Sequence, residues 1–496
     1  MMLCGWVQEQ ITMKFRIHTK LINRGLTLLL LSLVLVATLF ILQLFLYHEK
    51  HNSISTHNIN TIWPYLNTNY DRAEDLKSGD SLRPATLSQH HKFSDLKYNQ
   101  LKMYHSKGLT LRRQFDCQQL FENSSSEQNK VVEFHTQNQN TYPVIANDIA
   151  TAFTSDCEAF KTIRQYRTDR GSFIEGEFPL AYVILVHKDF EHVERLLRTI
   201  YMPQHSICIH VDDKAPDSLK EAVASLASCF TNVILASKPQ GIVYAHVSRL
   251  LADVICMSDL LKKDKSWRYL INYAATEFPL RTNLETVKIL NLLHGLNDIH
   301  EQYERRLQDR FKTEYRVDNG RMKQTNVKLP PPPFNMTIIK GQAYNTYSRK
   351  FLEWMVSDDK PRKLLEWSNK TFSPDEHYWA TLNDLYHNSF LDAPGGFKGH
   401  PDKKGYITRF ISWQYSKPRF KCHGRSVRNI CNFSALDLPI FISEMHLAAN
   451  KFDLTYDPIA YACMEELIQN KTLAQLPFNL QDYSRLYFIN YKSSDS

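Results

Sequence analysis

The chain has 496 residues, of which 43% are hydrophobic and 23% are charged. These fractions are ordinary for a globular protein, and they exclude a largely disordered scaffold. The formal net charge is +8, but Lys and Arg are spread along the chain without a block of five or more like charges, which argues against nucleic-acid binding. The length suits one large α/β domain with a tether as well as it suits two or three average domains.

An uncharged apolar stretch of 22 residues runs from Leu26 to Tyr47, and about 20 residues are enough for a helix to cross a bilayer. The cations that precede this stretch are Lys14, Arg16, Lys20 and Arg24. The positive-inside rule therefore predicts a cytosolic tail over residues 1–25, a signal-anchor helix over 26–47 and a lumenal remainder. A cleaved signal peptide is the alternative, but its apolar core is usually only about 7–15 residues long and no A-x-A-like site follows here.

Eight of the nine cysteines lie on the predicted lumenal side, where conditions are oxidising. They are Cys117, Cys157, Cys208, Cys229, Cys256, Cys422, Cys431 and Cys463. The even number suits four disulfides, although eight cysteines permit about 105 pairings, and metal binding is less favoured because no CxxC pair occurs. Five Asn-x-Ser/Thr sequons predict glycosylation sites at Asn123, Asn335, Asn369, Asn432 and Asn470.

Residues 48–150 are rich in Asn, Gln, His, Ser and Thr and contain few apolar runs, so they are predicted to form a lumenal stem. A helix around Cys117 that docks on the folded part is the alternative. Residues 151–496 are predicted to form the folded domain, which begins with a nearly continuous apolar run at 178–187, typical of a strand covered on both faces.

Helical and strand patterns then alternate, as expected for a Rossmann-like half of a domain. Helices are predicted at 190–200 and 246–261, and strands at 206–212, 232–236 and 267–273. Such sheets bind ligands at the carboxyl ends of their strands, so His187, Asp212 and the segment after Tyr273 are expected at a binding site. No GxGxxG follows the first strand, which disfavours a dinucleotide.

The segment Ser373-Pro374-Asp375-Glu376 has two interpretations. It has the residues of a helix N-terminus, with Ser at the N-cap, Pro at the first position and Glu at the third, so that Glu376 would only cap the backbone. Alternatively, the Glu376 carboxylate is a general base that removes a proton from an attacking hydroxyl. The residues alone do not decide between the two.

Asp212 and Asp213 in the sequence HVDDK invite a metal-binding interpretation. Adjacent side chains of a strand point to opposite faces, however, so the two carboxylates are not expected to chelate one ion together.

The sequence Ser-Pro-Asp-Glu-His-Tyr-Trp-Ala-Thr at 373–381 resembles the catalytic-glutamate motif of the core 2/I-branching β-1,6-N-acetylglucosaminyltransferases (glycosyltransferase family 14). The similarity continues at 178–189, 196–218, 228–238, 269–283 and 450–458, and it spans about residues 150–465. The resemblance implies a GT-A-like α/β fold, with a Rossmann-like nucleotide-binding half and a mixed central sheet, in the Golgi lumen. It also implies an inverting transfer of GlcNAc from UDP-GlcNAc to the 6-hydroxyl of a Gal or GalNAc acceptor in O-glycan or polylactosamine branching, with no metal and no cofactor.

The same resemblance assigns roles to individual residues. It makes Glu376 the general base. Residues near the donor would be His187, Asp212, Tyr244, Arg428 and Lys451, with the last two replacing a metal ion at the diphosphate. Residues near the acceptor would be Arg310, Trp413 and Tyr415. The implied disulfides are Cys117 with Cys463, Cys157 with Cys229, Cys208 with Cys256, and Cys422 with Cys431.

Two segments depart from the family pattern. Well-known members have Asn-Leu-Cys-Gly-x-Asp-Phe-Pro where this chain has residues 272–279, with Ala274 in place of the free cysteine. Their Leu-Glu-Thr segment, which supplies a glutamate to the acceptor, is Ile299-His300-Glu301 here. No unpaired lumenal thiol is therefore expected, and acceptor recognition is expected to differ unless Glu301 takes that place.

The expected partners are UDP-GlcNAc, a glycoprotein glycan and the membrane, with a homodimer left open. Two alternatives are a transferase for another UDP-sugar such as UDP-xylose, and a catalytically silent lumenal glycan-binding protein on the same fold.

Overall fold

The computed structural model describes residues 113–138, 142, 144–303, 307–389, 405–414, 421–475 and 477–486. The predicted cytosolic tail, the predicted signal-anchor helix and residues 48–112 of the predicted stem lie outside this part. Among the helices that are described, none has the length and apolar character needed to span a membrane.

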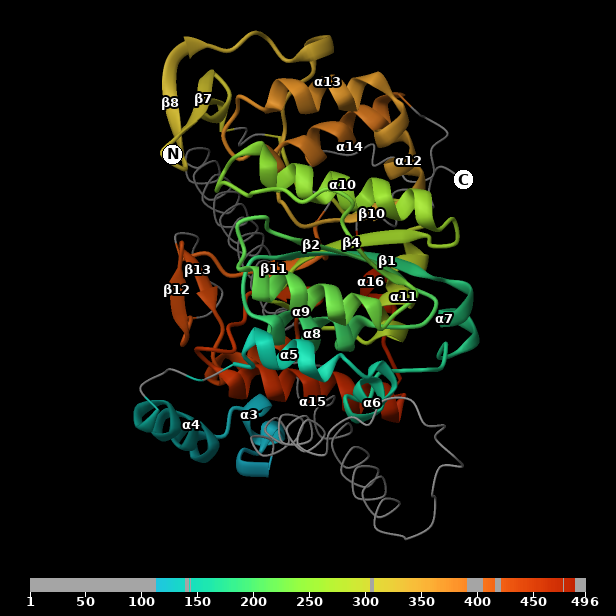
Figure 1. The fold of residues 1–496 in the computed structure, drawn as a ribbon, viewed down its shortest axis with the longest axis vertical. Helices are drawn as coiled ribbons and strands as arrows, with labels where there is room; N and C mark the ends of the chain where they lie inside the picture. Colours follow the sequence, from blue (N-terminus) through green and yellow to red (C-terminus); the bar gives the residue numbers. More distant parts are fainter. Residues whose placement is uncertain are drawn as a thin grey trace, which may run out of the picture. The chain divides into compact units, whose positions relative to one another are not determined.

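A five-stranded sheet lies at the centre, with its strands in the order β10-β4-β1-β2-β3 (Figure 1). The strands are β1 (Leu180–Val186), β2 (Ser206–Val211), β3 (Val233–Leu235), β4 (Tyr269–Ala274) and β10 (Thr346–Ser348). β1 pairs in parallel with β2 and β4, whereas β10 runs antiparallel to β4. The protein is therefore a mixed α/β structure with a mixed central sheet, and the strands predicted from the sequence are confirmed.

Both faces of the sheet are covered by helices, and alternate residues of β1 face the two sides. Leu180, Tyr182 and Ile184 join the apolar cluster on one side, and the residues between them join the cluster on the other. The first cluster includes residues of α8 (Phe190–Ile200), α9 (Asp217–Ser228) and α11 (Asn283–Leu292). The second includes residues of α10 (Val247–Lys263), α12 (Arg349–Ser357) and α14 (Tyr378–Ser389). The near-continuous apolar sequence of β1 is explained by this burial on both faces.

Smaller sheets and ribbons bring distant parts of the chain together. A three-stranded sheet combines β5 (Glu277–Pro279), β11 (Arg409–Ile411) and β14 (Ala448–Asn450). The two-stranded ribbons pair β6 (Glu301–Gln302) with β9 (Lys340–Gly341), β7 (Thr313–Asp318) with β8 (Arg321–Lys328), and β12 (Arg425–Val427) with β13 (Ile430–Asn432).

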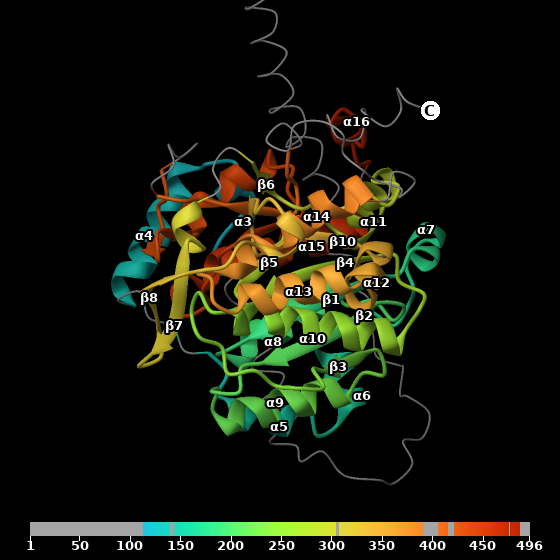
Figure 2. The ribbon, with the colours of Figure 1, turned by 90° about the horizontal axis from the view of Figure 1, so that it is seen from above.

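The remaining helices complete the layers around the sheets. They are α3 (Cys117–Phe121), α4 (Ser125–Gln137), α5 (Asn147–Phe153), α6 (Cys157–Ile163), α7 (Phe173–Glu177), α13 (Asp359–Ser368), α15 (Pro458–Ala474) and α16 (Gln481–Ser484). Short 3-10 helices occur at Gln308–Arg310, Pro333–Asn335, Pro374–Glu376 and Ala435–Ile442. Seen from above, α12 and α13 lie over α10 (Figure 2).

The first described helices lie within the predicted stem, yet they pack on the folded domain. In α3 the side chains of Leu120 and Phe121 are buried, and Cys117 is bonded to Cys463 of α15. In α4 the imidazole of His135 contacts the Asp457 carboxylate at 2.9 Å. The alternative of a docked helix around Cys117 therefore holds, and α3 and α4 pack on the folded domain although they precede the predicted stem boundary at residue 150.

The structure joins the eight cysteines in the four pairs that the family resemblance implies. These are Cys117–Cys463, Cys157–Cys229, Cys208–Cys256 and Cys422–Cys431. Three of the sequon asparagines, Asn123, Asn335 and Asn369, are exposed. Asn432 and Asn470 are only 2% and 7% exposed, so the predicted glycosylation at these two positions is corrected: the fold leaves their side chains little room for a glycan.

Removal of the disulfide between Cys117 and Cys463 is expected to lower the free energy of unfolding by about 2–5 kcal/mol, because this bond closes the longest loop. The pair is 346 residues apart in sequence, whereas Cys422 and Cys431 are 9 apart. Chemical denaturation of the variant Cys117→Ala with Cys463→Ala measures the loss. The matched control replaces Cys422 and Cys431 by Ala, and a loss in that control as large as in the first variant would contradict the loop-length argument.

Candidate active site

The carboxyl ends of β1 and β2 place two of the predicted donor residues side by side. His187 directly follows β1 and Asp212 directly follows β2, and these two strands are paired in parallel. Asp212 is buried, and its Oδ1 accepts hydrogen bonds from the backbone N–H of Lys214 at 3.0 Å and of Ile242 at 3.1 Å. Asp213 is exposed, so the adjacent carboxylates face different surroundings and do not form a joint chelate.

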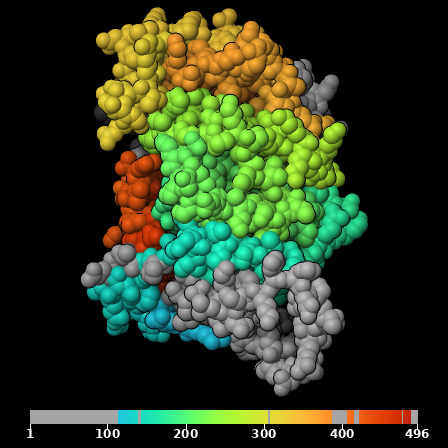
Figure 3. Space-filling view, viewed as in Figure 1, coloured from blue at the N-terminus to red at the C-terminus, as the bar shows by residue number. Residues whose placement is uncertain are grey.

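Arg428 lies at the centre of the predicted donor residues. It sits in the two-residue turn between β12 and β13, where both Arg428 and Asn429 have positive φ, as tight hairpin turns require. Its guanidinium lies 4.7 Å from the centroid of the Tyr244 ring, and Tyr244 is 64% exposed. The hairpin (orange-red) is seen at one edge of the view in Figure 3.

The electrostatic environment connects Arg428 to the remaining donor residues. Burial lowers the pKa of Lys451, and the neighbouring Arg428 cation lowers it further. Burial also lowers the pKa of His187. The Arg428 charge lowers this pKa further, whereas the Asp212 charge raises it. The structure thus brings together all five residues that the resemblance assigns to the donor.

Two further cations belong to this group and were missed in the sequence. Lys188 and Arg425 lie 3.7 Å and 2.8 Å from the same carboxylate oxygen of Asp453. Burial would raise the pKa of Asp453, but a hydrogen bond from Thr455 and the Lys188 charge lower it to about 2. Four cations therefore lie here beside three carboxylates, those of Asp453, Asp189 and Asp212, and the local excess of positive charge suits a polyanionic ligand.

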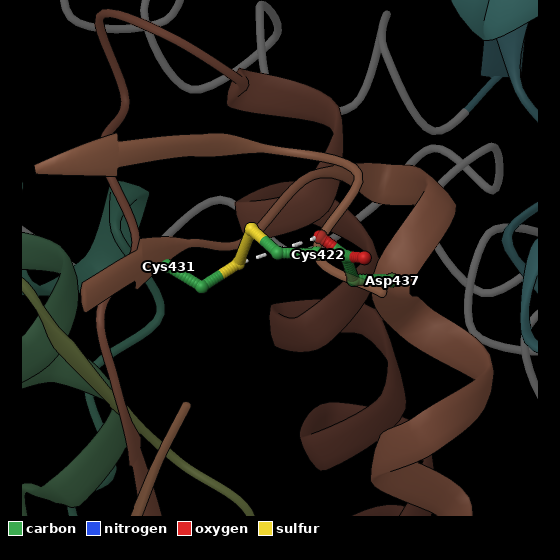
Figure 4. Close-up of side chains that lie close together, drawn as sticks. All are labelled: Cys422, Cys431 and Asp437. Atoms are coloured by element: carbon green, nitrogen blue, oxygen red, sulfur yellow. Dashed lines mark hydrogen bonds between the residues drawn. A yellow bond between two sulfur atoms is a disulfide. The ribbon is translucent and has the colours of Figure 1, made fainter. Parts of the chain in front are cut away.

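A disulfide and a buried carboxylate hold the hairpin that carries Arg428 (Figure 4). Cys422, Cys431 and Asp437 are close enough to resemble a metal site, but the two sulfur atoms are bonded to each other and are not available as ligands. The Asp437 carboxylate instead accepts backbone hydrogen bonds from His423, Gly424 and Ser434. This group is therefore a structural clamp on the hairpin.

Glu376 does not cap a helix. Ser373 has a φ of 48° and makes no side-chain capping bond, the 3-10 helix spans only Pro374–Glu376, and α14 begins at Tyr378. Glu376 Oε2 instead accepts a hydrogen bond of 2.6 Å from Arg310 and lies 3.0 Å from Lys340 Nζ. The capping interpretation of the segment is therefore wrong, and the carboxylate is held by two cations.

The pKa values of the adjacent carboxyl groups of Asp375 and Glu376 are shifted in opposite directions. Burial alone would raise the pKa of Glu376, but Lys340 and Arg310 outweigh it and hold that pKa below its usual value. Burial raises the pKa of Asp375 to about 6 against the opposing Arg249 cation, whose Nε lies 3.4 Å from its carboxylate. Glu376 is thus the member of the pair that remains ionised in mild acid.

The donor residues and Glu376 are connected through the segment that precedes and begins α10. The Ser373 N–H donates a hydrogen bond of 2.8 Å to the carbonyl of Ala245, which follows Tyr244. One turn into α10, Arg249 contacts Asp375. These two contacts connect the segment that carries Glu376 to the part of the chain that carries Tyr244.

The predicted acceptor residues are only partly brought together. Arg310 lies on Glu376, as described, whereas Trp413 is half-buried and forms a β-bridge with Ile430 of β13. Tyr415 lies outside the described residues. Glu301 is buried, and its carboxylate accepts a hydrogen bond of 2.5 Å from Asn383 of α14.

Comparison with known proteins shows the family to which the chain belongs. The model of the family "Core-2/I-Branching enzyme" matches residues 180–440. The chain belongs to this family. Among its relatives, a human β-1,3-galactosyl-O-glycosyl-glycoprotein β-1,6-N-acetylglucosaminyltransferase is 40% identical over 338 residues, which cover 65% of this chain and 77% of that protein.

Two further relatives of this chain have similar names. Human β-1,3-galactosyl-O-glycosyl-glycoprotein β-1,6-N-acetylglucosaminyltransferase 3 is 38% identical over 334 residues, covering 65% of this chain and 75% of that protein. A β-1,3-galactosyl-O-glycosyl-glycoprotein β-1,6-N-acetylglucosaminyltransferase of bovine herpesvirus 4 is 36% identical over 401 residues, covering 78% of this chain and 88% of that protein.

Gly341 of β9 is expected to be intolerant of a side chain. A Cβ there would lie 2.6 Å from the His300 carbonyl oxygen and 2.9 Å from the Ala380 Cβ. Gly341→Ala should therefore push β9 away from α14 and lower the free energy of unfolding by about 1–3 kcal/mol, as measured by chemical denaturation. The control is Gly176→Ala, whose Cβ would meet no atom closer than 3.9 Å; equal losses in both variants would contradict the packing argument.

Proposed function

We propose that this chain, on a GT-A-like fold, transfers GlcNAc from UDP-GlcNAc to the 6-hydroxyl of a Gal or GalNAc residue in O-glycan or polylactosamine branching, with inversion and without a metal ion. The names of its relatives support the reaction. The observations that carry the proposal are the cation group around Arg428 and the Glu376 carboxylate, which Arg310 and Lys340 hold ionised.

The cation group would bind the donor. Arg428 and Lys451 offer fixed positive charge to a diphosphate, and a guanidinium with its planar fork of donors suits two phosphate oxygens. As the bond from the sugar to UDP breaks, negative charge grows on the leaving diphosphate, and preorganised cations stabilise it most at that moment. The exposed ring of Tyr244 is available for stacking beside Arg428.

Glu376 would be the general base. Its Oε2 is held by Arg310 and Lys340, whereas no described residue donates a hydrogen bond to Oε1, and the side chain is 27% exposed. The acceptor 6-hydroxyl would give its proton to Oε1 while its oxygen bonds to the anomeric carbon and the carbon–oxygen bond to UDP breaks. Attack from the side opposite the leaving group inverts the anomeric centre.

We further propose that the protein is a single-pass type II membrane protein of the Golgi, anchored through residues 26–47 with the described part in the lumen. The apolar sequence at 26–47 and the four disulfides support this compartment.

Glu376→Gln is expected to lower kcat by about 10²–10⁴-fold, because the amide cannot accept the proton of the acceptor. The measurement is release of UDP and formation of product from UDP-GlcNAc and Galβ1-3GalNAc. The control is Glu366→Gln on α13, an exposed glutamate that pairs with Arg362, which should keep wild-type activity. Unchanged turnover in Glu376→Gln would exclude Glu376 as the base.

Chelation by EDTA is expected to leave the transfer rate unchanged, whereas Arg428→Met should weaken UDP binding by about tenfold or more, since a hydrogen bond to a charged group contributes roughly 1.5–3 kcal/mol. The rate with and without EDTA and the UDP affinity by calorimetry are the readouts. Loss of transfer on chelation, with recovery on adding Mn²⁺, would contradict the metal-free mechanism.

A further inference from the structure

Lys340 is a cation in direct contact with Glu376 that neither the sequence motifs nor the family resemblance indicated. It lies on β9, and its Nζ is 3.0 Å from Glu376 Oε2. Nζ also donates a hydrogen bond to the carbonyl of Gly341. The Lys340 side chain is only 14% exposed, so its ammonium occupies a fixed place beside the carboxylate rather than an average of many surface positions.

The burial of Lys340 requires the contact with Glu376. Burial lowers the pKa of Lys340, and the Glu376 carboxylate opposes that effect. A buried ammonium without a partner is costly, and a cation paired with a carboxylate is much less so. The pairing of β9 with β6 at Gly341 and Glu301 fixes the strand, and the close packing of Gly341 against the His300 carbonyl leaves it little freedom.

The two cations bind the same oxygen of Glu376. Arg310 contacts Oε2 from one side and is itself held by its position over the Phe372 ring. Lys340 contacts Oε2 from β9. This arrangement holds Oε2 and leaves Oε1 without a hydrogen bond from the described residues.

We propose that Lys340 is a positioning residue of the reaction: together with Arg310 it holds Oε2 of Glu376, so that Oε1 is the oxygen that meets the acceptor hydroxyl. This inference rests on the proposed function, in which Glu376 is the general base. It explains how a carboxylate that is only 27% exposed, and that burial would tend to neutralise, remains able to accept a proton.

The other groups around Glu376 do not replace Lys340. Arg310 is the second cation and remains in every variant below. Asp375 faces Arg249 of α10. His377 is buried, and burial together with the Arg310 charge lowers its pKa to about 3, so it stays neutral.

The test is the pH dependence of kcat/KM for Lys340→Met. A cation near Glu376 favours its ionised form, so loss of the cation lets Glu376 become protonated at a higher pH. Because transfer requires ionised Glu376, the acid limb of the profile is expected to move to higher pH. At a pH on that limb, the ratio of kcat/KM to its maximum should be several-fold smaller for the variant than for the wild type. Lys340→Arg, which keeps the charge, should restore the wild-type limb.

Lys340→Gln keeps a hydrogen-bond donor without the charge and should move the limb as Met does, which provides the same test if Met impairs folding. The matched control is Lys363→Met, an exposed lysine of α13 that pairs with Asp359, and its profile should equal that of the wild type. Thermal unfolding and UDP affinity verify that each variant is folded with an intact donor site.

An unmoved acid limb in Lys340→Met and Lys340→Gln, or an equal loss of activity at every pH, would overturn the inference, because a purely structural lysine gives that result. So would a shift in Lys340→Arg as large as that in Lys340→Met. Failure of the proposed function is distinguishable from these outcomes: in that case the wild-type protein itself transfers no GlcNAc, or Glu376→Gln retains activity.

Discussion

A fully buried ion pair between Arg409 and Glu277 sets the position of the donor residues. The three strands of the smaller sheet each supply one member of this group: Glu277 from β5, Arg409 from β11 and Asn450 from β14. Glu277 lies 3.2 Å from Arg409 and accepts hydrogen bonds from the side chain of Asn450 at 2.5 Å and from the backbone of Ala274 at 2.9 Å. Buried charges are tolerated only with such partners, so the register of the three strands is strongly constrained. Lys451 follows Asn450 directly, and its place beside Arg428 depends on that register.

The charges of the site fall into two groups with different balances. Around Arg428 the four cations exceed the three carboxylates of Asp453, Asp189 and Asp212, which suits a ligand that arrives with negative charge and leaves with more. Around Glu376 two cations act on one carboxylate, which keeps a base ionised although it is largely buried. The loop before α10 and the first turn of α10 contact the segments that carry both groups, and they therefore connect the donor residues to the base.

Local sequence patterns were sufficient for the elements whose signal is local. The apolar run of β1 and the helical spacing of α8 predicted both elements within a few residues, because burial on both faces or on one face leaves a direct trace in the sequence. The Ser-Pro-Asp-Glu segment misled in its capping interpretation, since the left-handed backbone of Ser373 is imposed by packing against Ala245 rather than by the segment itself. The docking of helix α3 at Cys117 and the burial of Asn432 also depend on contacts with distant residues, which composition does not reveal.

The residues of the site also differ in whether the sequence indicates them. Arg428, Lys451 and Glu376 were assigned through a family resemblance, and the structure places Lys451 in the electrostatic environment of Arg428. Lys340 lies 36 positions before Glu376 in sequence and reaches it only because β9 pairs with β6. Nothing near Lys340 in the sequence distinguishes it from a surface lysine. The same holds for Lys188 and Arg425, whose shared partner is Asp453.

The bond between Cys117 and Cys463 has a consequence for the order of events during synthesis. The helix α3 is made early, but the cysteine it must join in α15 is added 346 residues later, which at about 5–20 residues per second takes roughly a minute or less. During that interval Cys117 is a thiol without its final partner, while Cys157, Cys208 and Cys229 have already emerged. The closing of the domain is thus deferred until nearly the whole chain is available, and correct pairing relies on the earlier cysteines engaging one another first.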